Sequence, residues 1–168
     1  MENLIISACL LGVECKYSGG SNALPEETIG KLKERYRLIP VCPETAGGLP
    51  TPRDPSERFG GRVVSCRGAD VTQQFEKGAQ AALVLAKRYG CTKALMKEHS
   101  PSCGSGLIYD GSFSGKLIKG DGCAAELLKA AGVSVVGENM TELLTMVCKA
   151  EEDKNFHIIR LDRISYGP

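Results

Sequence analysis

The sequence predicts one α/β domain of three layers: a mostly parallel sheet, helices on both of its faces, and small hairpin additions. Short continuous apolar runs, typical of strands buried on both faces, alternate with segments of helical periodicity. The chain has 168 residues, of which 42% are hydrophobic and 24% charged, which is ordinary for a globular domain with a sizeable core. Such alternation favours parallel strands joined by helical crossovers, and therefore a Rossmann-like arrangement.

Four apolar runs are the expected strands of the sheet. They lie at 4–6, 38–41, about 93–97, and 133–136. Pro40, in the second run, has no N–H to donate to a neighbouring strand. We therefore expect this run at an edge of the sheet or at a strand terminus.

Helical spacing of apolar residues predicts four helices. They lie at about 25–36, 71–89, 121–131, and from Asn139 to about 148. Pro25 is typical of a first turn. Asp70 is expected to cap the second helix, and Asn139 with Glu142 resembles a capping box.

Two further segments predict small additions to the sheet. Residues 62–66, with a turn at 67–69, indicate a small hairpin or an edge strand. Residues 107–117 predict an irregular hairpin with an Asp-Gly turn. Between the elements, residues 43–55 form a loop rich in proline and glycine, and long loops of this kind are usually functional.

We expect one domain over residues 1–150 and a C-terminal tail over 151–168. The tail contains one more apolar run at 156–159, which could be an edge strand or a contact with a partner. The sequence shows no internal repeat and no linker between domains.

Composition excludes several classes of function. A net charge of +1, 5% aromatic residues and no tryptophan argue against a nucleic-acid partner. No apolar run approaches the roughly 18 residues of a membrane span, and the segment before Cys9 is too short for a signal peptide. Eight cysteines without a secretory signal indicate a reduced, cytoplasmic protein that uses some thiols for metal binding or catalysis.

Three cysteines, Cys9, Cys42 and Cys103, each follow a predicted strand. Functional sites of parallel sheets lie beyond the carboxyl ends of the strands, so the fold should collect these thiols at one edge. Three thiolates can bind zinc or an iron–sulfur cluster. Three protein ligands on a four-iron cluster would leave one iron open to a soft sulfur donor.

The stretch 99–106 is the strongest local candidate for a working loop. It places Cys103 among small, turn-forming residues, where glycine backbone N–H groups are expected to point at the thiol. Glu44 could act as a general base on water. Further polar candidates, each of which could equally be a solvated surface residue, are Arg53, Glu57, Lys97, Glu98 and His99.

The remaining cysteines have simpler explanations. Cys148 is expected in the core, and Cys66 and Cys91 are expected to be structural or incidental. Cys15 and Cys123 lie near glycine-rich turns and could line a site.

Three separated motifs resemble the DUF523 family, part of which is known as thiouracil desulfurase or desulfidase. They are Ser7-Ala8-Cys9-Leu10-Leu11-Gly12, Pro40-Val41-Cys42-Pro43-Glu44 with Gly47-Gly48-Leu49 and Pro52-Arg53, and Lys97-Glu98 followed by Ser100-Pro101-Ser102-Cys103-Gly104. The resemblance covers about residues 3–145 and leaves out the tail.

This resemblance implies a [4Fe-4S] cluster held by Cys9, Cys42 and Cys103, with the fourth iron open. It implies catalytic roles for Glu44 and Ser100, and we expect Ser102, Arg53 and Lys97 to bind the substrate. The implied reaction is non-redox: the open iron polarises a thiocarbonyl sulfur, water attacks the carbon, and sulfide leaves. The expected partner is a small thiolated nucleobase such as 2-thiouracil, or a related thiocarbonyl compound.

Two other readings of the residues stay open. One is a metal-free sulfurtransferase with Cys103 as a persulfide-carrying nucleophile. The other is a non-catalytic protein that binds a cluster or zinc.

Overall fold

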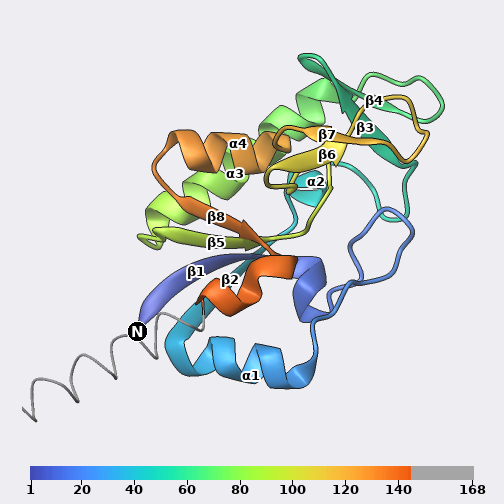
Figure 1. The fold of residues 1–168 in the computed structure, drawn as a ribbon. Coiled ribbons are helices and arrows are strands. Elements are labelled where there is room, and N and C mark those ends of the chain that lie inside the picture. Colours follow the sequence, from blue (N-terminus) through green and yellow to red (C-terminus); the bar gives the residue numbers. More distant parts are fainter. Residues whose placement is uncertain (145–168) are drawn as a thin grey trace, which may run out of the picture.

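The computed structural model describes residues 1–144, which form a three-layer α/β fold (Figure 1). Its centre is a four-stranded parallel sheet in the order β2-β1-β5-β8. The strands are β1 (Glu2–Ser7), β2 (Tyr36–Val41), β5 (Lys93–Met96) and β8 (Ser134–Gly137). The expected fold class is confirmed.

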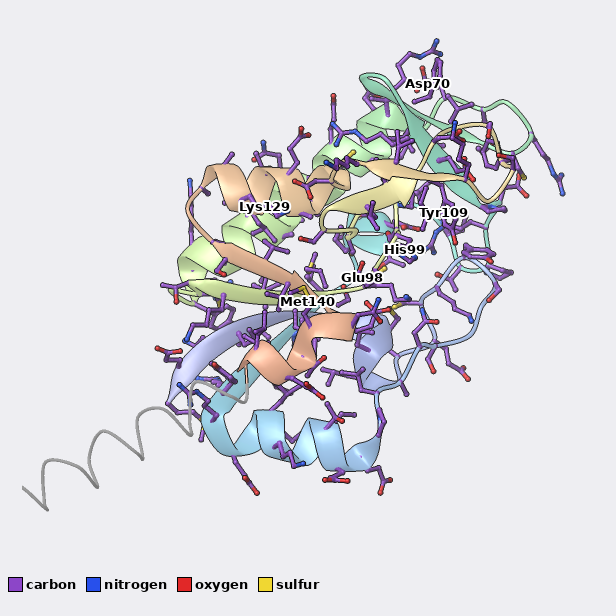
Figure 2. The ribbon with its side chains drawn as sticks, viewed as in Figure 1. Asp70, Glu98, His99, Tyr109, Lys129 and Met140 are labelled. Atoms are coloured by element: carbon purple, nitrogen blue, oxygen red, sulfur yellow. The ribbon has the colours of Figure 1, made fainter. Side chains whose placement is uncertain are left out.

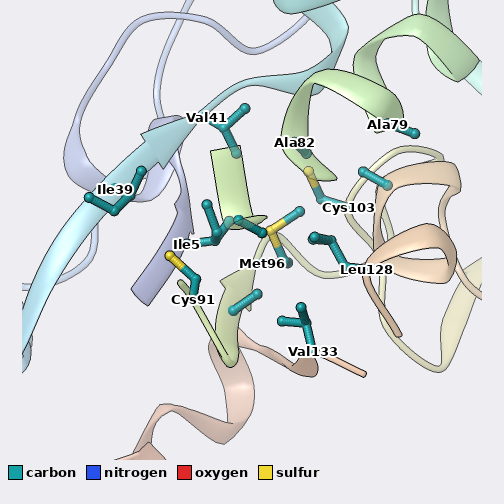
Figure 3. Close-up of a cluster of buried hydrophobic side chains, with 13 residues drawn as sticks. Ile5, Ile39, Val41, Ala79, Ala82, Cys91, Met96, Cys103, Leu128 and Val133 are labelled. Carbon is teal, nitrogen blue, oxygen red and sulfur yellow. The ribbon is translucent and has the colours of Figure 1, made fainter. Parts of the chain in front are cut away.

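Helices cover both faces of the sheet (Figure 1). On one face lie α3 (Thr72–Arg88) and α4 (Cys123–Ala130). On the other face lie α1 (Glu26–Arg35) and a helical turn at 141–144. Because side chains alternate along β1, Ile5 packs with α3 and α4, whereas Leu4 packs in the core beside α1. Figure 3 shows the first of these two cores.

Pro40 lies in an edge strand, as expected from its missing N–H. Strand β2 is an edge strand, and Pro40 lies opposite Ile6 in the register with β1. A proline is tolerated there because one side of an edge strand has no neighbour to receive hydrogen bonds.

Two small antiparallel hairpins stand beside the sheet. One joins β3 (Ser56–Phe59) to β4 (Arg62–Ser65), and the other joins β6 (Leu107–Tyr109) to β7 (Leu117–Lys119). The expected turn at 67–69 is present: Val64 and Asp70 form an antiparallel bridge across it, and the N–H of Ser65 donates to the carbonyl of Ala69 at 2.8 Å. The β3–β4 hairpin itself turns at 60–61, where Gly60 adopts φ +59°, a backbone conformation that glycine accepts without strain.

Two expected helix caps differ by one or two residues. Val71, not Asp70, is the N-cap of α3, but the Asp70 carboxylate accepts the backbone N–H of Thr72 at 3.0 Å. Hydrogen bonds from Thr72, and then from Arg62, lower the pKa of Asp70 to about 2. Asp70 therefore stabilises the start of α3 from the position before the N-cap.

Asn139 is not an N-cap either. It lies inside the 3-10 turn η2 (Glu138–Met140), and the helix begins at Thr141. The Thr141 hydroxyl donates to the carbonyl of Glu138 at 2.6 Å. The extra turn keeps the chain at the carboxyl edge of the sheet before the helix starts.

Short helical segments directly follow three strands at this edge. They are η1 (Ala8–Leu11) after β1, α2 (Pro43–Ala46) after β2, and η2 after β8. No helix of the described residues is long and apolar enough to span a membrane. The helix end expected near 148, with Cys148, the domain boundary at 150 and the run 156–159 all lie outside the described residues.

Candidate active site

A cavity of about 470 Å³ lies beyond the carboxyl ends of β1, β2 and β5. It is at the point where the strand order reverses, since the sheet continues from β1 to β2 on one side and from β1 to β5 on the other. The segments that follow these strands contribute most of the wall: Ser7, Ala8, Cys9, Cys42, Pro43, Glu44, Lys97, Glu98, His99, Ser100, Pro101 and Cys103.

The structure brings the three candidate thiols into this one wall. Cys9 lies in η1, Cys42 is the N-cap of α2, and Cys103 lies in the loop after β5. Cys9 and Cys103 are buried, and Cys42 is half-buried. Parallel strand ends therefore do gather residues that are far apart in the sequence.

Burial disfavours the thiolate forms of Cys9 and Cys103. Burial raises the pKa of the Cys9 thiol, although a hydrogen bond from Asn22 opposes the rise. Burial also raises the pKa of Cys103, against a hydrogen bond from Ser7, and the nearby charges of Glu44 and the other two thiols add to it. Their thiolate forms therefore need a bound cation to compensate the negative charge.

The donor set fits an iron–sulfur cluster. Within residues 1–144, no three Cys, His, Asp or Glu side chains lie close enough together to hold a single metal ion. A cluster makes a different demand, because its irons stand apart and each iron that the protein holds takes a separate cysteine thiolate. Three cysteines in the wall of one cavity, two of them buried and one half-buried, fit that demand with one iron left open.

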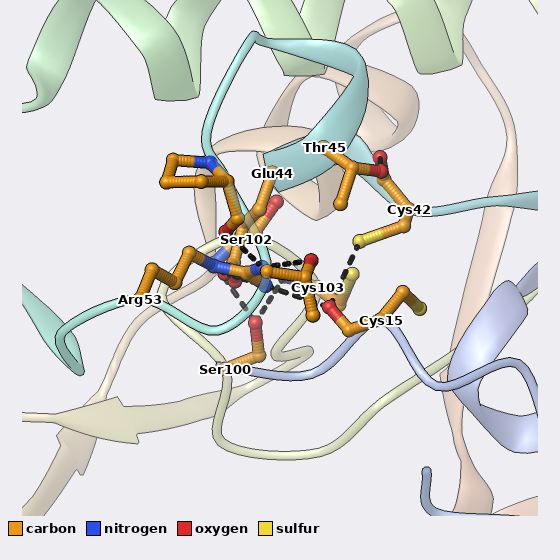
Figure 4. A network of polar contacts seen from close by, with 10 residues as sticks. Cys15, Cys42, Glu44, Thr45, Arg53, Ser100, Ser102 and Cys103 are labelled. Carbon is orange, nitrogen blue, oxygen red and sulfur yellow. Dashed lines mark hydrogen bonds and ion pairs between the residues drawn. The ribbon is translucent and has the colours of Figure 1, made fainter. Parts of the chain in front are cut away.

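Ser100 organises the loop that carries Cys103 (Figure 4). Its hydroxyl oxygen accepts the backbone N–H groups of Ser102 and Cys103, each at 3.1 Å. Its carbonyl accepts the N–H of Gly104 at 2.8 Å, and a Cβ on Gly104 would lie 2.8 Å from that same oxygen. With both lone pairs of the hydroxyl engaged, the remaining function of Ser100 Oγ is to donate its proton.

The glycine N–H groups of this loop do not point at the thiol, contrary to the expectation from composition. Gly104 donates to Ser100, and Gly106 donates to the carboxylate of Asp121 at 2.7 Å. Their hydrogen bonds hold the shape of the loop instead.

Arg53 holds Glu44 in the wall (Figure 4). Nε and Nη2 of Arg53 both contact Oε2 of Glu44, at 2.7 and 2.5 Å. The other donors reach the carbonyls of Pro50 and Cys15 and the hydroxyl of Thr51. All five N–H groups of the guanidinium thus have acceptors, and the side chain is only 7% exposed.

Only one oxygen of Glu44 is committed to this contact. Among the described residues no hydrogen bond or ion pair reaches Oε1. Glu44 therefore combines a fixed orientation with one available carboxylate oxygen.

Lys97 places a positive charge in the same wall. Its ammonium pairs with Glu138 of η2 and donates to the carbonyl of Glu98 at 3.4 Å. Its backbone N–H donates to the hydroxyl of the buried Ser7 at 2.9 Å. The charge of Lys97 also acts on the Cys9 thiol, whose pKa it lowers against the larger effect of burial.

Ser102 and Glu57, two other predicted site residues, form hydrogen bonds that hold neighbouring segments of the chain. Ser102 is completely buried and does not line the cavity; its carbonyl accepts the N–H groups of Ala124 and Ala125 at the start of α4. Glu57 does line the cavity, but its carboxylate accepts the N–H groups of Gly111 and Phe113 and so holds the loop of the second hairpin.

Cys15 and Cys123, the two cysteines that could line a site, have different positions in the structure. Cys15 is buried in the cavity wall, and the Cys42 thiol donates to its carbonyl at 3.8 Å. Burial, with the nearby Cys42, raises the pKa of Cys15 to about 12. Cys123 begins α4 and is not part of the cavity wall.

Sequence reasoning missed three residues of the site. Asn22 and Tyr109 line the cavity, and Glu138 orients Lys97. They come from a loop, from a hairpin and from a turn after β8, and none of them belongs to a recognisable motif.

Comparisons with known proteins agree on one family. A family model described as 2-thiouracil desulfurase matches residues 4–140. The uncharacterized protein YbbK of Bacillus subtilis (strain 168) is 43% identical over 146 residues, which cover 81% of this chain and 95% of that protein. The family model thus includes every strand of the central sheet except the first two residues of β1.

A solved structure extends the agreement to three dimensions. The [4Fe-4S]-dependent thiouracil desulfidase TudS (DUF523Vcz) is 43% identical and superposes with a TM-score of 0.84, covering 89% of this chain and 99% of that one. This protein is accordingly an enzyme homologous to a sulfur-removing enzyme. Because the family model matches most of the chain and the solved structure is 43% identical to it, the chain belongs to the 2-thiouracil desulfurase family.

Proposed function

We propose that this enzyme hydrolyses the C=S bond of a thiolated pyrimidine such as 2-thiouracil, without net redox change, and uses a [4Fe-4S] cluster bound by Cys9, Cys42 and Cys103. Water supplies the new carbonyl oxygen, and the sulfur leaves as sulfide. The observation that carries the proposal is the convergence of three strand-end thiols with Glu44 and Ser100 on one cavity. The family match and the likeness to TudS support it.

Three cysteine ligands would leave one iron of the cluster without a protein ligand. When bound, the cluster would supply that iron as a thiophilic Lewis acid for the sulfur of the substrate. The charge of Lys97 beside Cys9 would help to balance the negative charge of the thiolates.

Glu44 is the group that would take a proton from the attacking water. Arg53 fixes its Oε2, so its Oε1 is held in one orientation in the cavity wall. A positioned carboxylate of this kind is a general base, and fixed orientation is part of its efficiency. Since every donor of Arg53 is engaged, we assign Arg53 to positioning Glu44 and not to direct binding of substrate.

Ser100 and Lys97 are the groups that would donate hydrogen bonds to the ring. The Ser100 hydroxyl accepts two backbone N–H groups and so presents its proton. Lys97 has three ammonium protons, two of which face Glu138 and the carbonyl of Glu98. The third is available to a carbonyl or ring nitrogen of the substrate.

The geometry disfavours a persulfide mechanism at Cys103. A nucleophilic cysteine needs a lowered pKa and access to solvent. Cys103 is buried, and its surroundings raise its pKa. A reduced-thiol cluster site also fits the cytoplasmic location expected from the cysteine content.

The test is anaerobic reconstitution with iron and sulfide, followed by incubation with 2-thiouracil. We expect bound iron, a visible absorption band that changes when 2-thiouracil is added, and release of uracil and sulfide in equal amounts. Cys9→Ala, Cys42→Ala and Cys103→Ala should each lose the iron. Cys91→Ala is the matched control, because Cys91 and Cys103 are both 6% exposed and belong to the same core.

Two outcomes would contradict the proposal. An iron-free wild-type protein that still released sulfide would remove the cluster from the reaction. Equal iron content in all four variants would show that these cysteines are not its ligands.

A further inference from the structure

Two aromatic side chains of the cavity wall form a pair that the reaction described above does not use. The described cavity wall contains three aromatic rings, those of Tyr17, His99 and Tyr109. The rings of His99 and Tyr109 lie 6.0 Å apart between centroids, at an interplanar angle of 65°. Figure 2 shows Glu98, His99 and Tyr109 in a row from the end of β5 towards the second hairpin.

The backbone holds the His99 ring in place at the expense of a strained conformation. His99 has φ +62°, which non-glycine residues adopt rarely and which clusters at functional sites. A bridge between His99 and Ile108 joins this loop to β6, directly before Tyr109. The contact between loop and hairpin therefore sets the two rings side by side.

Both rings keep part of their surface accessible. His99 and Tyr109 are half-buried, and the His99 side chain is 31% exposed. The carboxylate of Glu98 lies 3.9 Å from Nε2 of His99. His99 also directly precedes Ser100, so its ring borders the place where the substrate would react.

We propose that the His99–Tyr109 pair is a specificity-determining wall in which one ring stacks on the flat face of the substrate ring and the other, inclined at 65° to the first, packs against it from the side. This inference rests on the proposed function and names the residues that would select its substrate. The preferred substrates are planar, conjugated thiocarbonyl heterocycles, whereas open-chain thioamides and puckered rings lack the extended flat ring that such a wall binds. Stacking on aromatic side chains tolerates different bases because each has a π-face, so the wall selects for ring planarity and the polar groups select among rings.

The experiment compares two sulfur-free ligands of the reconstituted enzyme, uracil and 5,6-dihydrouracil, by calorimetric titration. Both present the same two carbonyls and two ring N–H groups, but only uracil is planar and conjugated. Wild-type enzyme should bind uracil more tightly, on the order of tenfold, as expected for one stacked base. His99→Asn and Tyr109→Leu should remove that preference by weakening uracil alone.

The variants are chosen so that folding does not confuse the result. Asparagine tolerates the positive φ of residue 99. Tyr109→Phe keeps a ring and should keep the preference. Phe113→Asn removes the other aromatic ring held at positive φ, which lies outside the cavity wall, and should bind both ligands as the wild type does.

The outcomes distinguish this inference from the proposed function. A wild-type enzyme that does not favour uracil, or variants that weaken both ligands equally, would overturn the stacking wall even if 2-thiouracil is desulfurated. Uracil preference that depends on His99 would support the wall even if 2-thiouracil itself is not turned over, in which case the failure lies with the proposed reaction.

Discussion

Glu44 and Arg53 form a nearly buried ion pair, with side-chain exposures of 16% and 7%. Such a pair contributes little net stability, because the desolvation of two charges offsets their attraction. Its value is in orientation: the planar fork of arginine fixes one carboxylate oxygen and anchors on three acceptors of the surrounding loops. A lysine would bring the same charge without the fork.

Glu44→Gln should keep the iron and reduce kcat by about 10²–10⁴-fold, the usual loss when a general base is removed. Arg53→Lys should also keep the iron and reduce kcat, with little change in KM, because the carboxylate loses its fixed orientation. Iron analysis and steady-state kinetics of the reconstituted variants would measure both effects.

Arg62→Lys is the control for Arg53→Lys. Arg62 pairs with Asp70 on the surface, where the arginine is 66% exposed, and kcat should not change. Undiminished turnover in Glu44→Gln would exclude Glu44 from proton transfer.

At the scale of elements, α2 is placed by close backbone contact with α3. A Cβ on Gly78 of α3 would lie 1.9 Å from the carbonyl oxygen of Pro43, and a Cβ on Gly47 would lie 1.9 Å from the carbonyl oxygen of Gln74. Two glycines thus allow the backbones to touch. Because α2 carries Glu44 and follows Cys42, this contact sets the position of two site residues.

Gly78→Ala should destabilise the protein by about 1–3 kcal/mol, the usual cost of overpacking a tight contact. It should also reduce iron binding, since α2 must move away from α3. Urea unfolding of the cluster-free protein and iron analysis after reconstitution measure the two effects separately.

Gly30→Ala is the matched helix variant. Gly30 lies in α1, is exposed, and has nothing within 4 Å of its added Cβ. Alanine should therefore stabilise the protein by about 0.5–1 kcal/mol through helix propensity alone, without changing iron content. If Gly78→Ala behaved in the same way, the close contact would not be what positions α2.

At the scale of the whole molecule, the cavity joins the ends of three strands whose following segments are far apart in the sequence. The thiols come from η1, from the start of α2 and from the loop after β5, which are separated by the whole of α1 and α3. A ligand that binds all three thiols at once connects these segments. Binding to the native state alone stabilises it by mass action.

Cluster-loaded protein should therefore unfold at a higher urea concentration than cluster-free protein. A ligand present at a hundred times its Kd adds about 2.7 kcal/mol to the free energy of unfolding. Anaerobic unfolding of both forms would measure the difference, which Cys103→Ala should abolish and Cys91→Ala should retain. Equal stability of the two wild-type forms would mean that the thiols do not share one ligand.

Much of this architecture was predictable because it depends on local patterns. The four strands follow from buried apolar runs, and the edge position of β2 follows from Pro40, whose missing N–H excludes it from a central strand. The gathering of Cys9, Cys42 and Cys103 follows from strand direction alone, since parallel strands all end at the same edge.

Other features depend on contacts between distant segments, which no local pattern encodes. The pairing of Lys97 with Glu138, the hairpin that brings Tyr109 beside His99, and the burial of Ser102 under α4 are all of this kind. The pairing of β4 with the preceding β3 is similar, because no local pattern predicted a strand at β3.

The sequence by itself determined the layers, the order of elements along the chain and the edge at which the three thiols meet, because periodicity and strand direction are local properties. Only the tertiary structure decided which side chains face the cavity, which carboxylate oxygen stays available, and which rings stand beside the reacting group. Those depend on how segments far apart in the chain pack against one another.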